Sequence, residues 1–313
     1  MISERWIIGQ GLLGQAIGRA RPDAPFGVRI PWSQPDRAVE ALADGLHTFV
    51  SAAATDNRLE IFWSAGRAVT STARELVLRE AQIFERFLDV LGGMHDSDRA
   101  RLVVVLASSV GGAYAGSSSP PFSEATPEAP ASAYGEGKLL MEAALAEATA
   151  AGGWRSAVGR LTNIYGPGQD LTKGQGLISV LVRAHLTDTP ATIYVPLDTL
   201  RDYIYEDDAA RLMSAMASRA ATMPAGTTTV KIVGSGRAVS VGALVGELQR
   251  LKRRRGTIVL GSSAAAQGQA LDLRVRSRVW RDLDGLVRTT LPEGLNRVHR
   301  AQLADLGNPR ASR

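Results

Sequence analysis

A glycine-rich segment follows the first apolar run of the chain. Trp6-Ile7-Ile8 is typical of a buried strand, and Gly-Gln-Gly-Leu-Leu-Gly at 9–14 comes directly after it, at the start of a helical pattern. Such a segment permits a tight turn and lets amides at a helix N-terminus approach a pyrophosphate. An ordinary turn is the alternative in a chain with 32 glycines, but the position favours a dinucleotide site at Gly9, Gly11, Leu12, Leu13 and Gly14.

Short apolar runs alternate with helical patterns through the first half of the chain. We expect strands at 27–30, 59–63, 102–107 and 156–161, and helices at 38–53, 73–91 and 132–150. Apolar strands that alternate with helices are typical of a parallel sheet covered on both faces. The predicted fold class is therefore α/β, a doubly wound parallel sheet of the Rossmann type.

The alternation changes after residue 168, where the apolar pieces become shorter and mixed. The length of 313 residues suits about two units, at roughly 150 residues per domain. We expect a dinucleotide-binding Rossmann domain at 1–168 and a smaller C-terminal α/β domain at 169–313 that binds substrate. Part of 192–211 is expected to return to the first domain.

Composition excludes several classes of site. The chain has no cysteine, and its four histidines, His47, His95, His185 and His299, lack metal-ligand spacing, so we expect no metal. No apolar run reaches the roughly 18 residues of a membrane span, and the start lacks a secretory signal, so a cytoplasmic protein is expected. The net charge is +5, and the basic run at 252–255 is interpreted as a solvated helix end rather than a nucleic-acid surface.

Two hydroxyls and a tyrosine–lysine pair suggest acid–base chemistry. Ser108 and Ser109 end the strand at 102–107, and Tyr134 and Lys138 begin the helix at 132–150, where a spacing of four puts them on one face. A free tyrosine has a pKa of about 10, and a nearby ammonium favours its phenolate. Ser109, or less favourably Ser108, then holds the reacting oxygen. Two surface residues are the alternative for a lone Tyr/Lys pair, but the glycine segment and the serines make chance a poor explanation.

The tip of the expected second strand carries no carboxylate for the adenosine ribose. Asp23 precedes this strand, and Asp36 lies in the next helix. Arg29 either meets a 2′-phosphate, which would make the cofactor NADP(H), or is a surface arginine.

Several segments, in order along nearly the whole chain, resemble the extended short-chain dehydrogenases/reductases, and more narrowly their nucleotide-sugar epimerase/dehydratase group. They are Gly-Gln-Gly-Leu-Leu-Gly at 9–14, Ser-Ser-Val-Gly-Gly-Ala-Tyr at 108–114, Tyr134 with Lys138, Arg-Leu-Thr-Asn-Ile-Tyr-Gly-Pro-Gly at 160–168, Arg-Asp-Tyr-Ile-Tyr-Glu-Asp-Asp at 201–208, Lys-Ile-Val-Gly-Ser-Gly-Arg-Ala-Val-Ser at 231–240 and Pro-Glu-Gly-Leu at 292–295.

The resemblance implies an NAD(H) or NADP(H) cofactor and a nucleotide-sugar substrate. It implies Ser109, Tyr134 and Lys138 as catalytic residues, and Ala65 and Gly66 as a turn that lines the cofactor. For substrate it implies Asn163, Arg201 for the diphosphate, and Tyr114, which has an equally weighted alternative role in packing. A homodimer across the helices at 73–91 and 132–150 is also implied.

The sequence departs from that family at three places. Between residues 30 and 59 there is room for one helix only, where the family has an extra strand that ends near the adenine. Glu80 or a neighbour stands where the family often has an asparagine, and Val110 and Gly111 replace the acidic pair of the sugar dehydratases.

The absence of the acidic pair at Val110 and Gly111 argues against dehydration. We therefore expect reduction of a keto group on a nucleotide-linked deoxysugar, with NADPH slightly favoured. The alternatives are a nucleotide-sugar epimerase, and a non-catalytic cofactor-binding or RNA-associated protein on the same fold.

Overall fold

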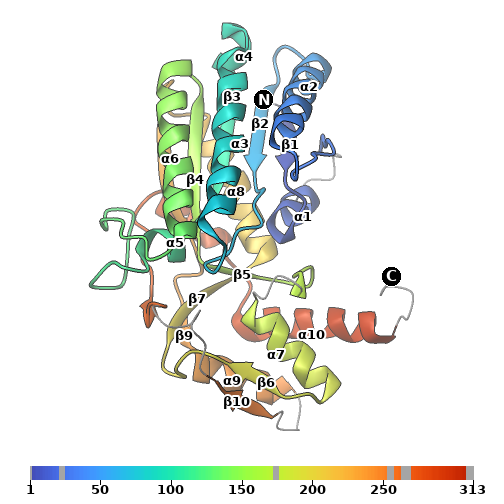
Figure 1. The fold of residues 1–313 in the computed structure, drawn as a ribbon, viewed down its shortest axis with the longest axis vertical. Coiled ribbons are helices and arrows are strands. Elements are labelled where there is room, and N and C mark those ends of the chain that lie inside the picture. The colour runs from blue at the N-terminus through green and yellow to red at the C-terminus, as the bar shows by residue number, and fades with distance from the viewer. Residues whose placement is uncertain (1, 21–24, 172–175, 252–256, 262–268, 308–313) are drawn as a thin grey trace.

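The computed structural model describes residues 2–20, 25–171, 176–251, 257–261 and 269–307; the basic run at 252–255 lies outside them. Its central feature is a five-stranded parallel sheet in the order β1-β2-β3-β4-β8 (Figure 1). The strands are β1 (Ser3–Ile8), β2 (Arg58–Trp63), β3 (Leu102–Ser109), β4 (Arg155–Leu161) and β8 (Thr228–Val233).

Helices cover both faces of this sheet because its strands are apolar on both sides. Val104 of β3 packs toward one face and Val103 and Val105 toward the other. The first face is covered by α2 (Pro35–Ala52), α3 (Arg74–Gly92) and α6 (Ala133–Gly152). The second is covered by α1 (Leu12–Arg19), α8 (Glu206–Ala220) and a 3₁₀ segment, Arg281–Leu286. The predicted doubly wound Rossmann fold is confirmed.

The strand expected at 27–30 is wrong. One isolated parallel bridge joins Phe26 to Trp6, and residues 27–30 form no strand. Gly27 weakens a ladder, and the proline at position 31 has no N–H to continue one. At the outer edge of β1, a single bridge to Phe26 therefore stands in place of the expected strand.

A second group of elements lies below the sheet in Figure 1. Its strands are β5 (Asn163–Tyr165), β6 (Ala191–Ile193), β7 (Leu200–Tyr205), β9 (Ala238–Ser240), β10 (Ile258–Leu260) and β11 (Asp272–Leu273). Its helices are α7 (Leu177–Thr187), α9 (Val241–Leu251) and α10 (Leu291–Gly307), which share an apolar core with β6. Two short helices, α4 (Asp96–Ala100) and α5 (Val110–Tyr114), flank β3. The division of the chain at residue 168 stays a prediction.

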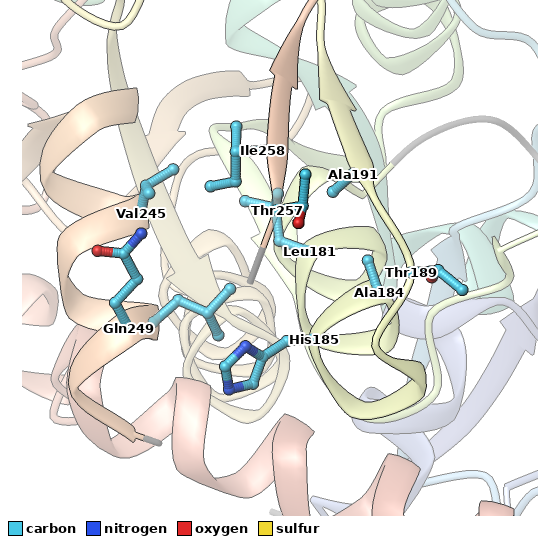
Figure 2. Close-up of a pocket in the computed structure, with 10 residues that line it drawn as sticks. Leu181, Ala184, His185, Thr189, Ala191, Val245, Gln249, Thr257 and Ile258 are labelled. Atoms are coloured by element: carbon cyan, nitrogen blue, oxygen red, sulfur yellow. The ribbon is translucent and has the colours of Figure 1, made fainter. Parts of the chain in front are cut away.

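This lower core contains a small apolar pocket. Leu181, Val245 and Ile258 point into it from α7, α9 and β10 (Figure 2). Its volume of about 20 Å³ is room for about one water molecule. It is thus a packing defect between these elements, too small for a sugar or a nucleotide.

The helix α10 offers a test of this core. Leu295 is 1% exposed and packs with α7 and β6, whereas Leu303 on the same helix is 53% exposed. Leu295→Ala should lower the free energy of unfolding by about 2–5 kcal/mol, because it removes buried methyl groups and leaves a cavity. Leu303→Ala should change it by less than about 0.5 kcal/mol. Equal effects in urea titrations would contradict the packing described.

Candidate active site

The glycine segment between β1 and α1 has the shape that a pyrophosphate needs. Gly9 has a φ of +98°, and a Cβ on it would lie 2.4 Å from the Ala65 nitrogen. A Cβ on Gly14 would lie 1.9 Å from the Gly9 carbonyl oxygen, so this glycine lets α1 pack against the loop. A Cβ on Gly11 would meet nothing within 4 Å. The loop therefore leaves open space at the N-terminus of α1, which begins with Leu12 and Leu13, and fits a dinucleotide.

The turn after β2 is held beside this loop. The Ser64 hydroxyl donates a hydrogen bond to the Gly9 carbonyl at 2.8 Å. The carboxylate of Glu80, on α3, accepts hydrogen bonds from the amides of Arg67 at 2.8 Å and Ala68 at 3.1 Å. Glu80 therefore anchors the turn that contains Ala65 and Gly66, both of which line a large cavity.

Ser109, Tyr134 and Lys138 line the same cavity, which has a volume of about 740 Å³. The Lys138 Nζ lies 6.0 Å from the centroid of the Tyr134 ring and donates to the Ala107 carbonyl at 3.2 Å. Ser109 ends β3 and caps α5, because its Oγ accepts from the Gly112 amide at 3.0 Å. The structure thus brings together the three residues that the sequence selects for proton transfer.

Ser108 has a different environment. It is 5% exposed, and its hydroxyl donates to the buried carboxylate of Glu142 on α6. Glu142 also accepts from Arg160 on β4, at 2.7 Å from Nη2. The Ser108 proton is therefore engaged in a buried network, which supports Ser109 rather than Ser108 as the residue that faces a substrate.

Tyr114 belongs to this network as well. Its side chain is fully buried, stacks on Phe122 at a centroid distance of 5.4 Å, and accepts from Arg160 Nη1 at 2.5 Å. Burial raises the pKa of Tyr114 despite the neighbouring guanidinium. The packing role, which was the alternative expected from sequence, fits this position.

Asn163 of β5 and Arg201 of β7 also line this cavity. The Asn163 amide donates to the Asp202 carbonyl at 2.9 Å, which fixes its orientation. Arg201 is 9% exposed and donates to the Leu200 carbonyl at 2.9 Å. Burial lowers the pKa of Arg201, although Tyr203 and Asp272 act in the opposite direction. A bound anion would offset the cost of keeping this charge buried. Arg29, by contrast, is exposed beyond the end of β1 and does not line this cavity.

A buried ionisable residue outside the cavity lining, Glu206, was not singled out from the sequence. Glu206 begins α8 and is 3% exposed, and its Oε1 accepts from Arg19 of α1 at 2.7 Å. It packs against Gly166, where a Cβ would lie 2.3 Å from its carboxyl carbon. Burial raises the pKa of Glu206 to about 7, with Arg19 opposing. In the sequence, the one indication of its burial is that Glu206 directly follows the strand β7.

Other kinds of site are not found in the described part of the chain. No three His, Asp or Glu side chains there gather as a metal site. No helix within the same residues is both long and apolar enough to cross a membrane.

Residues 64–232 match the model of the NAD dependent epimerase/dehydratase family. The chain belongs to this family. The match extends from the turn after β2 into β8, so it contains the serines, the Tyr134/Lys138 pair and Arg201. The expected cofactor, a nicotinamide dinucleotide, NAD(H) or NADP(H), is thereby confirmed. This cofactor fits the open space above Gly11.

Individual relatives agree with the family. A dTDP-4-dehydro-6-deoxyglucose reductase of Escherichia coli is 34% identical over 105 residues, about a third of either chain. Among solved structures, MoeE5 in complex with UDP-glucose and NAD has a TM-score of 0.77 at 24% identity, covering 97% of this chain and 100% of that one. RMD from Pseudomonas aeruginosa complexed with NADPH has a TM-score of 0.73 at 20% identity, covering 96% and 100%. At these identities the solved structures establish the fold.

Substitutions at two glycines of the loop should affect cofactor binding and protein stability separately. Gly11→Ala should leave the melting temperature unchanged but weaken the binding of NADH or NADPH, because the added methyl group would enter the space that the pyrophosphate needs. Gly14→Ala should lower the melting temperature, because its methyl group would overlap the Gly9 carbonyl. Calorimetric titration and thermal melts measure the two effects. Unchanged cofactor affinity in Gly11→Ala would place the pyrophosphate elsewhere.

Glu206 predicts a pH dependence of stability. Its pKa is about 7 in the folded chain against an ordinary value near 4.5, so the folded state binds more protons between these pH values. Stability should therefore fall as pH rises from about 5 to 8, and this fall should be smaller in Glu206→Gln. Asp36→Asn is the control, because this side chain is 86% exposed and pairs with Arg86, away from Glu206. If the melting temperatures of wild type and Glu206→Gln change with pH to the same extent, the raised pKa of Glu206 is contradicted.

Proposed function

We propose that this protein reduces a keto group on a nucleotide-linked deoxysugar. The observation that carries the proposal is that one cavity is lined by Ser109, Tyr134 and Lys138 and also by Arg201. The first three suit proton transfer at a carbonyl, and a buried arginine suits a diphosphate. The similarity to a dTDP-4-dehydro-6-deoxyglucose reductase supports reduction.

The proposed mechanism assigns each side chain one task. The bound nicotinamide would supply a hydride for the carbonyl carbon. The Tyr134 hydroxyl would give its proton to the carbonyl oxygen, which Ser109 would hold by a hydrogen bond. The Lys138 ammonium, which is fixed by the Ala107 carbonyl, would bind the nicotinamide ribose and favour the phenolate that remains.

The nucleotide would bind beside Arg201 and Asn163 in the cavity. The planar Arg201 guanidinium suits bidentate contact with phosphate oxygens, and Asn163 presents an amide held by the Asp202 carbonyl. Val110 and Gly111, which follow Ser109, offer no acid or base for removing water from the sugar. We therefore place the reaction among reductions, with NADPH as reductant.

Epimerisation is the second candidate. The UDP-glucose 4-epimerase of Thermotoga maritima has a TM-score of 0.69 at 20% identity, with 86% of this chain and 82% of that one covered. A Ser-Tyr-Lys site serves removal and return of a hydride equally well. In that case NAD would stay bound through turnover. A non-catalytic or RNA-associated role has no support from the cavity.

We also propose a homodimer in the cytoplasm. Leu76 on α3 and Leu140 on α6 are 51% and 45% exposed, and the two helices pack side by side. A second copy that pairs across this surface would bury both leucines.

Tyr134→Phe tests the reaction. With NADPH and dTDP-4-dehydro-6-deoxyglucose, this variant should lose about 10²–10⁴-fold in kcat and keep its NADPH affinity, because it loses one proton donor. Tyr194→Phe makes the same chemical change at a 52% exposed tyrosine away from the cavity and should behave as wild type. Oxidation of NADPH and the sugar product are both followed. Conversion of UDP-glucose to its 4-epimer without NADPH oxidation would replace reduction by epimerisation.

A further inference from the structure

Trp32 differs from most other tryptophans of the chain. Three of the five are buried: Trp6 is 0%, Trp63 2% and Trp154 1% exposed. Trp32 is 36% exposed, although full burial of its large apolar ring would stabilise the fold. An aromatic ring that is left partly in water at a defined place in the fold suggests a ligand.

The backbone places Trp32 at the carboxyl edge of the sheet. The Phe26 amide donates to the Arg5 carbonyl at 2.9 Å, and the bridge to Trp6 is parallel. The chain that follows Phe26 therefore runs alongside β1 and in the same direction. It then turns, with the Trp32 amide donating to the Ile30 carbonyl at 3.0 Å. This segment occupies the place of the missing strand, and Trp32 lies just beyond its end.

The orientation of the ring is fixed by a buried neighbour. Trp32 meets Trp63 at a centroid distance of 5.9 Å and an interplanar angle of 85°, and Trp63 packs on Phe84 at 4.8 Å. A perpendicular pair leaves at least one face of the Trp32 ring uncovered by Trp63. Trp63 is the last residue of β2 and directly precedes Ser64, Ala65 and Gly66. Trp32 is therefore coupled to the start of the turn that lines the cofactor site.

The missing strand removes an expected wall of the adenosine site. In a doubly wound sheet the dinucleotide lies across the carboxyl ends of the strands, and the tip of the second strand contacts the adenosine half. Here that strand is reduced to one bridge, and no carboxylate stands at its tip. An aromatic face supplies stacking energy without hydrogen bonds and accepts any base.

We propose that Trp32 forms the missing wall and stacks on the adenine ring of the dinucleotide. The inference rests on the cofactor site of the proposed function and adds a residue outside the catalytic cavity. It explains how a chain without the second strand still holds the adenosine half. It also assigns the contact to adenine rather than to the ribose, so Trp32 serves NAD(H) and NADP(H) alike.

Direct binding tests this assignment. Titrations of wild type, Trp32→Ala and Trp32→Phe use three ligands: NADPH, ADP-ribose, which has adenine but no nicotinamide, and reduced nicotinamide mononucleotide, which has no adenine. Trp32→Ala should bind NADPH and ADP-ribose about 5- to 100-fold more weakly and the mononucleotide equally well. Trp32→Phe should retain most of the affinity. Tyr194→Ala removes an exposed ring elsewhere and should change none of the three.

The outcomes separate the two proposals. If wild type binds NADPH and Trp32→Ala binds ADP-ribose as tightly as wild type, the stacking assignment is overturned while the cofactor site stands. Tighter binding by Trp32→Ala would also overturn it, because the ring would then occupy the place of the adenine. If wild type binds neither NADPH nor ADP-ribose, the proposed function and the Trp32 assignment fail together. A retained circular-dichroism spectrum shows that each variant is folded.

Discussion

The buried ion pair between Arg160 and Glu142 holds the candidate active site together. The two side chains are 4% and 7% exposed, and Arg160 donates to both carboxylate oxygens of Glu142. Arg160 also contacts Tyr114, and Glu142 accepts from Ser108. The pair thereby connects β4, β3, α5 and α6. Removing one partner of a buried pair costs about 3–5 kcal/mol, because the other charge is left uncompensated.

The arrangement of the candidate catalytic residues depends on that connection. Tyr134, Lys138 and Glu142 are four residues apart and therefore lie along one face of α6. The ion pair fixes the third of them against β4 and β3, so the other two face the end of β3, where Ser109 stands. The glycine loop fixes the second half of the site independently, because α1 packs against the Gly9 carbonyl through Gly14. Both halves lie at the carboxyl edge of one parallel sheet, where such folds bind ligands.

Local patterns predicted much of this and failed where tertiary packing decides. The strands at 59–63, 102–107 and 156–161 lie within β2, β3 and β4, since continuous apolar runs must be buried on both faces. The shorter run at 27–30, Gly-Val-Arg-Ile, contains a glycine and a charged arginine, and its ladder does not extend beyond the bridge at Phe26. The spacing of Tyr134 and Lys138 was visible in sequence. The raised pKa of Glu206, the burial of Tyr114 and the exposure of Trp32 depend on residues distant in the chain, so no local pattern reveals them.

We propose that this shortened sheet still binds a nicotinamide dinucleotide next to Tyr134 and Lys138. The most direct measurement is a crystal structure of the protein soaked with NADPH. We expect density for the pyrophosphate above Gly11 and for the nicotinamide beside the Tyr134 hydroxyl and the Lys138 ammonium. Density for the dinucleotide at another surface, or a saturating soak that leaves the Gly9–Gly14 loop without ligand, would contradict it.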